Sequence, residues 1–205
     1  TLQSISILSP GLREELDSEN TGVAVSILES EAAVDQVEAL ILERTDLLPY
    51  KSLNGSESEA FFESLKNTDA DSDVVIRIKC LPSIMKNLIC QIEALQSLVA
   101  DDSLDGLQFL AHYESGILLV LIDKLKLEDD WLAQSAETLK EFRDTVEQQG
   151  GSLTLLFAPE ALLKEVTPWG SLDELETLCA GLEKVFDPNQ ILSRSSSPQS
   201  EKEVS

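Results

Sequence analysis

The order in which strand-like and helix-like stretches follow one another is the feature that most restricts the fold of this chain. The sequence shows two strand–helix units, followed by a hairpin of two strands, a helix and a last strand. Short connections make the neighbours in such a series pack against each other. We therefore predict an α+β domain of ferredoxin-like type, with a mixed or antiparallel sheet and helices packed on one face.

The first strand–helix unit begins near residue 22. Val23, Val25 and Ile27 alternate with smaller residues, which is the period of a strand with one buried face. Ser30 is placed to start a helix, and Glu31 lies in the first turn, where the helix dipole favours an acid. The inner stripe predicted for this helix consists of Val34, Val37, Leu40 and Ile41.

The second strand–helix unit carries a charged residue inside its strand. Val74 to Ile78 is a β-branched run, and Arg77 falls on the opposite face from Ile76 and Ile78. Pro82 suits the first position of the following helix, where the missing N–H has no cost. The inner stripe predicted for that helix is Ile84, Leu88, Ile92 and Leu95.

The second half of the chain predicts a hairpin, a helix and a final strand. Leu107–Ala111 and Ile117–Ile122 are apolar stretches close enough to pair, with Ser115–Gly116 at the turn. A helix is predicted from Trp131 to Gln148, and the last strand from Ser152 to Phe157.

The boundaries of the domain are predicted from changes in composition. Residues 1–20 mix apolar and acidic side chains, and we expect a linker from an upstream domain missing from this sequence, with a short strand at Ile5–Leu8. Residues 21–192 form the expected domain, with a short helix at Ser56–Leu65. Residues 193–205 are serine-rich and polar, and are predicted to be a disordered tail. The first residue is Thr1 instead of methionine, so we expect a piece of a longer protein.

The charge of the chain excludes several classes of partner. The 205 residues include 38 acidic and 15 basic side chains, for a formal net charge of −23. A surface this negative repels phosphate backbones and anionic lipid. The longest apolar run, Ile117 to Ile122, is too short to span a bilayer. We therefore expect no nucleic-acid binding, no membrane insertion and a cytoplasmic location, or an organelle stroma if the source is eukaryotic.

The cysteines and the histidine do not form a pattern that binds metal. Cys80, Cys90 and Cys179 show no C-x-x-C spacing, and His112 is the only histidine. No metal site is predicted. Cys90 and Cys179 lie on or beside apolar helix stripes, which predicts that both are small buried side chains in a reducing compartment.

Two residues are candidates for chemistry. His112 lies at the end of a strand, two residues before Glu114, and a His–Glu pair could move a proton. The alternative, a histidine that is simply hydrogen-bonded at a strand end, is the more common situation. Arg77 could receive a carboxylate bidentately if its face of the sheet lines a pocket. An ion pair with one of the many acids is equally common.

No complete catalytic set occurs in the sequence. A Gly-rich phosphate loop, a G-x-S-x-G turn and a P-loop are all absent from it. Considered by itself, the chain therefore has the properties of a binding or accessory domain, and its catalytic residues stay unknown.

The stretch WGSLDELETLCAGLEKVFDPNQIL, residues 169–192, has a distinctive beginning and end. Ser171 and Glu174 form a capping box that starts a helix. Asp187 and Pro188 end it, because proline cannot donate to the helix ladder and the residue before it avoids helical dihedrals. The stripe Leu175, Leu178, Leu182 and Val185 is predicted to face an apolar surface, followed by the apolar pair Ile191 and Leu192.

This end of the chain resembles the C-terminal part of FAD-linked oxidases, and is most similar to the FAD-binding (E) subunit of bacterial-type glycolate oxidase. The segment GGSLTLLFAPEALLKEVTPWG followed by LEKVFDPNQIL has that family's Gly-Gly turn, Ala-Pro strand end, Trp-Gly pair and Phe-Asp-Pro terminus in the same order. Upstream, VVIRIKCLPS and AHYESGIL resemble a strand–helix start and a hairpin of the same family. The resemblance covers about residues 22–192.

The resemblance implies a C-terminal substrate or cap domain whose sheet covers the flavin. The full-length protein would oxidise a 2-hydroxy acid such as glycolate or D-lactate by hydride transfer to FAD, which the absent N-terminal domain would mainly hold. The chain alone would bind no cofactor and have no activity. Flavoprotein and iron–sulfur subunits are the implied partners. The positions implied to face the pocket or close the domains are Arg77, His112, Gly116, Trp169, Asp187 and Pro188.

Two departures from the family pattern support a second hypothesis. Leu192 is followed by Ser193-Arg194-Ser195, where the family continues Asn-Pro-Gly-Arg, and Glu114 replaces a glycine in the hairpin. These changes, together with the strong acidity, favour a non-catalytic interaction or scaffold domain descended from that family.

Overall fold

The computed structural model describes residues 2–8, 22–27, 31–44, 52–66, 72–100, 106–126, 130–170, 181–182, 184–188 and 191. The predicted linker after residue 8, the tail at 193–205 and the helix start at Ser171 and Glu174 lie outside these residues.

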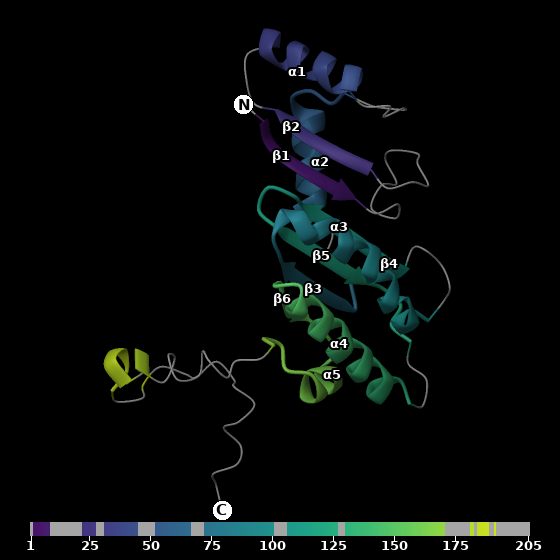
Figure 1. Ribbon diagram of the computed structural model, residues 1–205, viewed down its shortest axis with the longest axis vertical. Coiled ribbons are helices and arrows are strands. Elements are labelled where there is room, and N and C mark those ends of the chain that lie inside the picture. Colours follow the sequence, from purple (N-terminus) through teal and green to yellow (C-terminus); the bar gives the residue numbers. More distant parts are fainter. Residues whose placement is uncertain are drawn as a thin grey trace, which may run out of the picture.

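A six-stranded antiparallel sheet forms the centre of the protein (Figure 1). Its strands stand in the order β2-β1-β4-β5-β3-β6, and every neighbouring pair is antiparallel. The strands are β1 (Leu2–Leu8), β2 (Gly22–Ile27), β3 (Val74–Lys79), β4 (Leu107–His112), β5 (Ile117–Ile122) and β6 (Ser152–Phe157).

The helices alternate with the later strands in the predicted way. In chain order, β3, α3, β4, β5, α4 and β6 form a β-α-β-β-α-β unit whose strands lie in the order β4-β5-β3-β6. That order is the ferredoxin-like one, so the predicted α+β class is confirmed. The helices are α1 (Glu31–Arg44), α2 (Ser56–Lys66), α3 (Pro82–Gln91), the 3₁₀ helix η3 (Ile92–Leu98), α4 (Trp131–Gln148) and α5 (Glu160–Glu165).

The main core lies between the sheet and the helices α3, η3, α4 and α5. Alternation along β3 sends Ile76 and Ile78 into this core, where both are fully buried, and leaves Arg77 on the other face. The same alternation turns Leu118, Val120 and Ile122 of β5 inward. The helices cover these side chains with Met85, Leu88, Leu95, Leu139, Phe142 and Val146.

A second, smaller core lies on the opposite face of the sheet. Phe61 and Leu65 of α2 pack there against Leu8 of β1 and Leu110 of β4. The rings of Phe61 and Phe62 meet edge to face, with their centroids 5.3 Å apart. The predicted inward positions of this helix are thus occupied, and α2 covers the β1–β4 part of the second face.

The strand β1 corrects the domain boundary predicted from the sequence. Residues 2–8 fell within the expected linker, but they form a full strand between β2 and β4. The sequence predicts a strand only at Ile5–Leu8. Serine residues alternate with the apolar ones here, and the burial of Ser6, which is 1% exposed, gives no signal in a hydropathy pattern.

Other differences concern single elements. The helix predicted to run past Pro82 changes to 3₁₀ geometry at Ile92, and α5 was not predicted at all. Cys90 is exposed, so its predicted burial is wrong, while Cys179 lies outside the described residues. No described side chain of α1 is buried, and Leu40, placed in its inner stripe, is 45% exposed.

The turn between β4 and β5 depends on a glycine. Gly116 has φ +64°, in the left-handed region, and its carbonyl accepts a 2.8 Å hydrogen bond from the N–H of Cys80. A Cβ at this position would overlap the carbonyl oxygen of Cys80. The backbone of Cys80 cannot move aside as a flexible side chain could, so both the positive φ and the lack of space for a Cβ require glycine at this position.

We predict that Gly116→Ala lowers the free energy of unfolding by about 2–4 kcal/mol, since it adds a steric overlap to the left-handed backbone cost. Urea unfolding monitored by circular dichroism measures the loss. Gly55→Ala is the matched control, because Gly55 also has a positive φ of +53° but open space around its Cβ position. That variant should lose about 1–2 kcal/mol. Equal losses in the two variants would show that the packing against Cys80 contributes nothing.

Candidate functional site

Arg77 extends from the middle of β3 on the face opposite to the main core. It lies level with Leu119 of β5 and Thr154 of β6. The side chain is half-buried, and among the described residues its guanidinium has no ion-pair or hydrogen-bond partner. The planar donor fork is therefore available to bind a carboxylate bidentately.

His112 is the last residue of β4 and lies level with Ile117 of β5 and Ser6 of β1. Its Nδ1 is 3.1 Å from the Oγ of Ser6, within hydrogen-bond distance. This contact orients the ring at the strand end, which agrees with the alternative that His112 is a hydrogen-bonded structural residue. It also engages Nδ1 and leaves Nε2 as the nitrogen that can exchange a proton with a ligand.

Arg77 and His112 share one face of the sheet. They are separated by β5, so their backbones lie about 10 Å apart across two strand spacings and about 7 Å apart along the strands, or roughly 12 Å overall. Lys79 lies on the same face and in the same cross-strand row as His112. Arg77 and Lys79 thus place two cationic side chains on this face of a chain whose net charge is −23.

The turn beside His112 attaches β1 to the site. The Oε2 of Glu114 accepts a 2.9 Å hydrogen bond from the N–H of Ile5, and the N–H of Tyr113 donates to the carbonyl of Ile5 at 3.0 Å. The carboxylate of Glu114 therefore helps to hold a strand. Gly116, a predicted site residue, lies in this turn, and its described contacts are with the backbone of Cys80.

Trp169, another predicted site residue, lies on a short segment after α5 that returns along β6. The carbonyl of Pro168 accepts a 2.9 Å hydrogen bond from the N–H of Leu155. Gly170 then turns the backbone with φ +75°. We call residues 167–170 the return segment. The Trp169 side chain is 54% exposed.

A buried arginine, which the sequence analysis did not single out, holds the return segment. Arg143 of α4 is 7% exposed and donates to Thr167 through Nη2, 2.6 Å from the carbonyl oxygen, and Nη1, 3.3 Å from Oγ1. Burial lowers the pKa of its guanidinium, and the nearby Glu147 and Asp144 oppose that shift. Its Nε has no hydrogen-bond partner. The sequence feature that could have indicated its burial is its position next to Phe142, among the inward residues of α4.

The structure does not bring Asp187 and Pro188 to Arg77. They end a short helical piece at 184–186 that stands apart from the sheet in Figure 1. The Oδ1 of Asp187 accepts a 2.8 Å hydrogen bond from the N–H of Ile191, so the predicted helix stop has a local structural role. Of the apolar stripe predicted here, Leu182 and Val185 are exposed by 49% and 71%, while Leu175 and Leu178 lie outside the described residues. The neighbouring Phe186 is 77% exposed.

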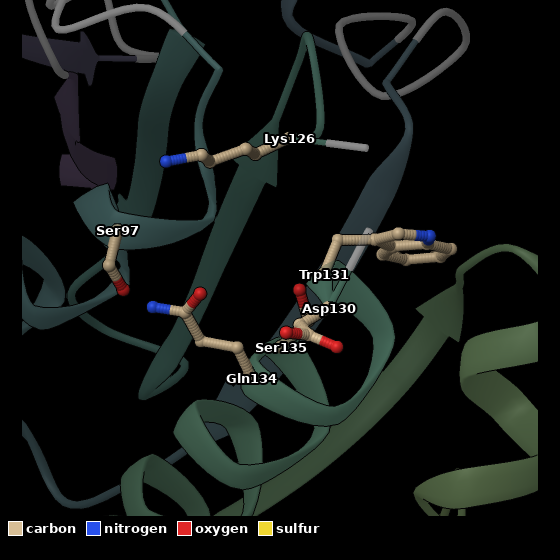
Figure 2. A pocket seen from close by; sticks show the side chains of 6 residues that line it. All are labelled: Ser97, Lys126, Asp130, Trp131, Gln134 and Ser135. Atoms are coloured by element: carbon tan, nitrogen blue, oxygen red, sulfur yellow. The ribbon is translucent and has the colours of Figure 1, made fainter. Parts of the chain in front are cut away.

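A shallow hollow on the helix side of the molecule contains none of the predicted site residues (Figure 2). It lies at the start of α4, and its lining is mostly polar: Ser97, Lys126, Asp130, Trp131, Gln134 and Ser135. The side chains of Lys126 and Trp131 extend away from each other in Figure 2, so they do not converge on one ligand.

Among the described parts of the chain, no group of three His, Cys, Asp or Glu side chains could hold a metal ion. None of the helices in those parts is long and apolar enough to cross a bilayer.

Comparison with known proteins adds no assignment. No protein-family model matches the chain, and no curated protein matches it.

We predict that Arg143→Met releases the return segment, because both hydrogen bonds to Thr167 are lost while most of the aliphatic volume is kept. The amide of Leu155, which donates to Pro168, should exchange with deuterium about tenfold faster or more. Hydrogen exchange read by NMR measures this rate. Lys140→Met, at an exposed position of the same helix, is the control. Unchanged exchange in Arg143→Met would mean that the arginine does not hold this segment.

Proposed function

We propose that this chain is the C-terminal substrate or cap domain of a glycolate-oxidase-like flavoprotein that oxidises a 2-hydroxy acid such as glycolate or D-lactate. The observation that carries the proposal is that Arg77 and His112 are half-buried on one face of a ferredoxin-like sheet, opposite to α3 and α4 and beside the part of that face that α2 covers. The ordered Gly-Gly, Ala-Pro, Trp-Gly and Phe-Asp-Pro motifs of the sequence support it independently.

In this proposal the residues of the chain bind and orient the substrate. Arg77 receives the carboxylate through its donor fork, and Lys79 adds positive charge on the same face. In the tautomer whose Nδ1–H donates to the Oγ of Ser6, the Nε2 of His112 is an acceptor and takes the proton of the substrate hydroxyl. FAD, held mainly by the upstream domain, would supply the hydride acceptor for the carbon that bears the hydroxyl, so that the alcohol becomes a carbonyl.

Ile117 of β5 lies level with His112 and Lys79 on this face and is half-buried. Leu119, level with Arg77, packs against the small core under α2. In this proposal the flavin ring would approach the sheet beside Ile117, where an apolar surface helps to exclude water from the reacting atoms. The FAD itself belongs mainly to an upstream domain, and this chain alone is expected to bind none.

The exposed apolar side chains near the C-terminal end suit contact with such a second domain. Trp169, Val185 and Phe186 are all more than half exposed. Trp169, Asp187 and Pro188 would then act in domain closure and not in chemistry. Further flavoprotein and iron–sulfur subunits are the proposed partners, and the proposed location is cytoplasmic, or an organelle stroma in a eukaryote.

A second candidate is a non-catalytic interaction or scaffold domain descended from the same family. The contact between Ser6 and His112 favours it, because it gives the histidine a structural role. The altered sequence after Leu192 favours it as well. In this case the exposed apolar residues would bind a protein partner, and no flavin would be involved.

The two candidates are separated by the mass and the visible absorption spectrum of the intact native protein. The proposed oxidase should be about twice the size of this chain and show flavin bands that bleach when glycolate or D-lactate is added anaerobically. A flavin-free protein of about the size of this chain would exclude the oxidase and leave the interaction domain.

For the intact flavoprotein, we predict that Arg77→Met lowers kcat/KM for the hydroxy acid about 10- to 100-fold, mainly through KM, because a charge-assisted contact to the carboxylate is lost. Stopped-flow reduction of the flavin measures the effect. Lys86→Met, an exposed change on α3, should leave the kinetics unchanged. If both variants reduce flavin like the parent protein, Arg77 does not bind the substrate.

A further inference from the structure

The end of β6 exposes two large apolar side chains that follow each other in the chain. Leu156 is 44% exposed and Phe157 is 57% exposed. Single exposed apolar residues are ordinary on a protein surface, so this pair is informative only through the groups that lie beside it.

A bulge in β6 places Phe157 on the face of Arg77. The register of β6 against β3 shifts between Leu155 and Phe157, which makes Leu156 the extra residue. Bulges redirect side chains in this way. Phe157 pairs with Val75, and Val75 lies on the same face as Arg77 because side chains alternate along β3. Residues directly opposite each other share a face, so Phe157 projects from the face of Arg77.

Phe157 and Arg77 are diagonal neighbours across the pair of strands. Val75, the partner of Phe157, stands two residues before Arg77 in β3. Diagonal neighbours lie about 7–8 Å apart, a distance that aromatic and long side chains can span. Thr154, the direct partner of Arg77 in β6, adds a hydroxyl on the same face. One small area of the sheet therefore holds a cation, a hydroxyl and an apolar ring.

The charge of this area favours an anion. Arg77 is half-buried without an ion-pair or hydrogen-bond partner among the described residues, and Lys79 follows it on the same face. The strands β3, β5 and β6 contain no acidic residue, although the chain has 38 of them. No neighbour in these three strands neutralises Arg77, and a carboxylate matches the geometry of its donor fork.

An organic acid with an apolar body would use both halves of this area. Its carboxylate would bind the fork of Arg77, while its body would cover Leu156 and Phe157 and remove apolar surface from water. Glycolate has no group for the second half. A purely apolar partner would desolvate Arg77 without pairing its charge, which is costly.

We propose that Arg77, Leu156 and Phe157 form one binding site for a 2-hydroxy acid with an aromatic or large aliphatic side chain. The carboxylate binds Arg77 and Thr154, and the side chain lies on Leu156 and Phe157. His112 lies on the other side of Arg77 along the sheet, so the hydroxyl and the side chain of the substrate reach different residues. This inference rests on the proposed function and narrows its substrate to acids such as phenyllactate.

NMR titration of the isotope-labelled chain with phenyllactate and with glycolate tests the site without any flavin. Phenyllactate should bind at least about tenfold more tightly, because only its ring covers apolar surface. It should shift the amide signals of Arg77, Thr154 and Phe157. The neutral phenyllactamide should bind at least about tenfold more weakly than phenyllactate, because it has no charge for Arg77.

Substitutions separate the two halves of the site. Phe157→Ala should remove the preference, so that the affinities for phenyllactate and glycolate become equal within about twofold. Arg77→Met should weaken the binding of both acids. Phe186→Ala is the matched control in the same titration, because Phe186 is 77% exposed on a piece that stands apart from the sheet in Figure 1, and it should keep the preference. Circular dichroism checks each fold, and Leu156→Ala replaces Phe157→Ala if the latter unfolds.

Equal affinities of the parent chain for the two acids would overturn the proposal, and so would a chain that binds neither acid at high millimolar concentration. A loss of preference in Phe186→Ala as large as in Phe157→Ala would also overturn it.

The intact native protein separates this inference from the proposed function. A flavin that is reduced with a higher kcat/KM by glycolate than by phenyllactate would uphold the oxidase and refute the inference. A flavin-free protein that binds phenyllactate through Arg77 and Phe157 would refute the oxidase and leave the binding site.

Discussion

The alternation of side chains along β3 is the constraint on which the rest of the structure depends. This strand pairs with β5 on one side and β6 on the other, so its orientation fixes which face of the sheet is buried. Ile76 and Ile78 are each 0% exposed. A slip of one residue would place Arg77 in that core, and burying a charge without a partner is costly enough to exclude this register. The register of β3 therefore determines both the burial of Ile76 and Ile78 in the core and the outward position of Arg77.

The candidate site follows from that register. Once β3 is set, β5 places apolar side chains beside Arg77, and β4 brings His112 to the same face. The glycine turn after His112 and the contact between Glu114 and Ile5 then hold β1 against β4. The candidate site therefore depends on the backbone pairing of β3, β5 and β4.

Local patterns in the sequence predicted most of the central unit, including the strand at Ser152–Phe157, the helix at Trp131–Gln148 and the outward side of Arg77. These stretches have strong periodicity and clear ends. The position of β1 depends on pairing with strands far away in the sequence, which no local pattern records. The hydrogen bonds of Arg143 to Thr167 and of Ser6 to His112 were also not predictable, because each joins residues distant in the chain.

Chemical modification with an arginine-selective dicarbonyl reagent, followed by peptide mass mapping, tests the face assignment most directly. Arg77 is half-buried without a partner among the described residues, whereas Arg143 is 7% exposed and bonded to Thr167. We predict that Arg77 reacts much faster than Arg143, and that glycolate slows the reaction at Arg77. Equal rates at the two arginines, or an Arg77 that does not react in the folded protein, would contradict it.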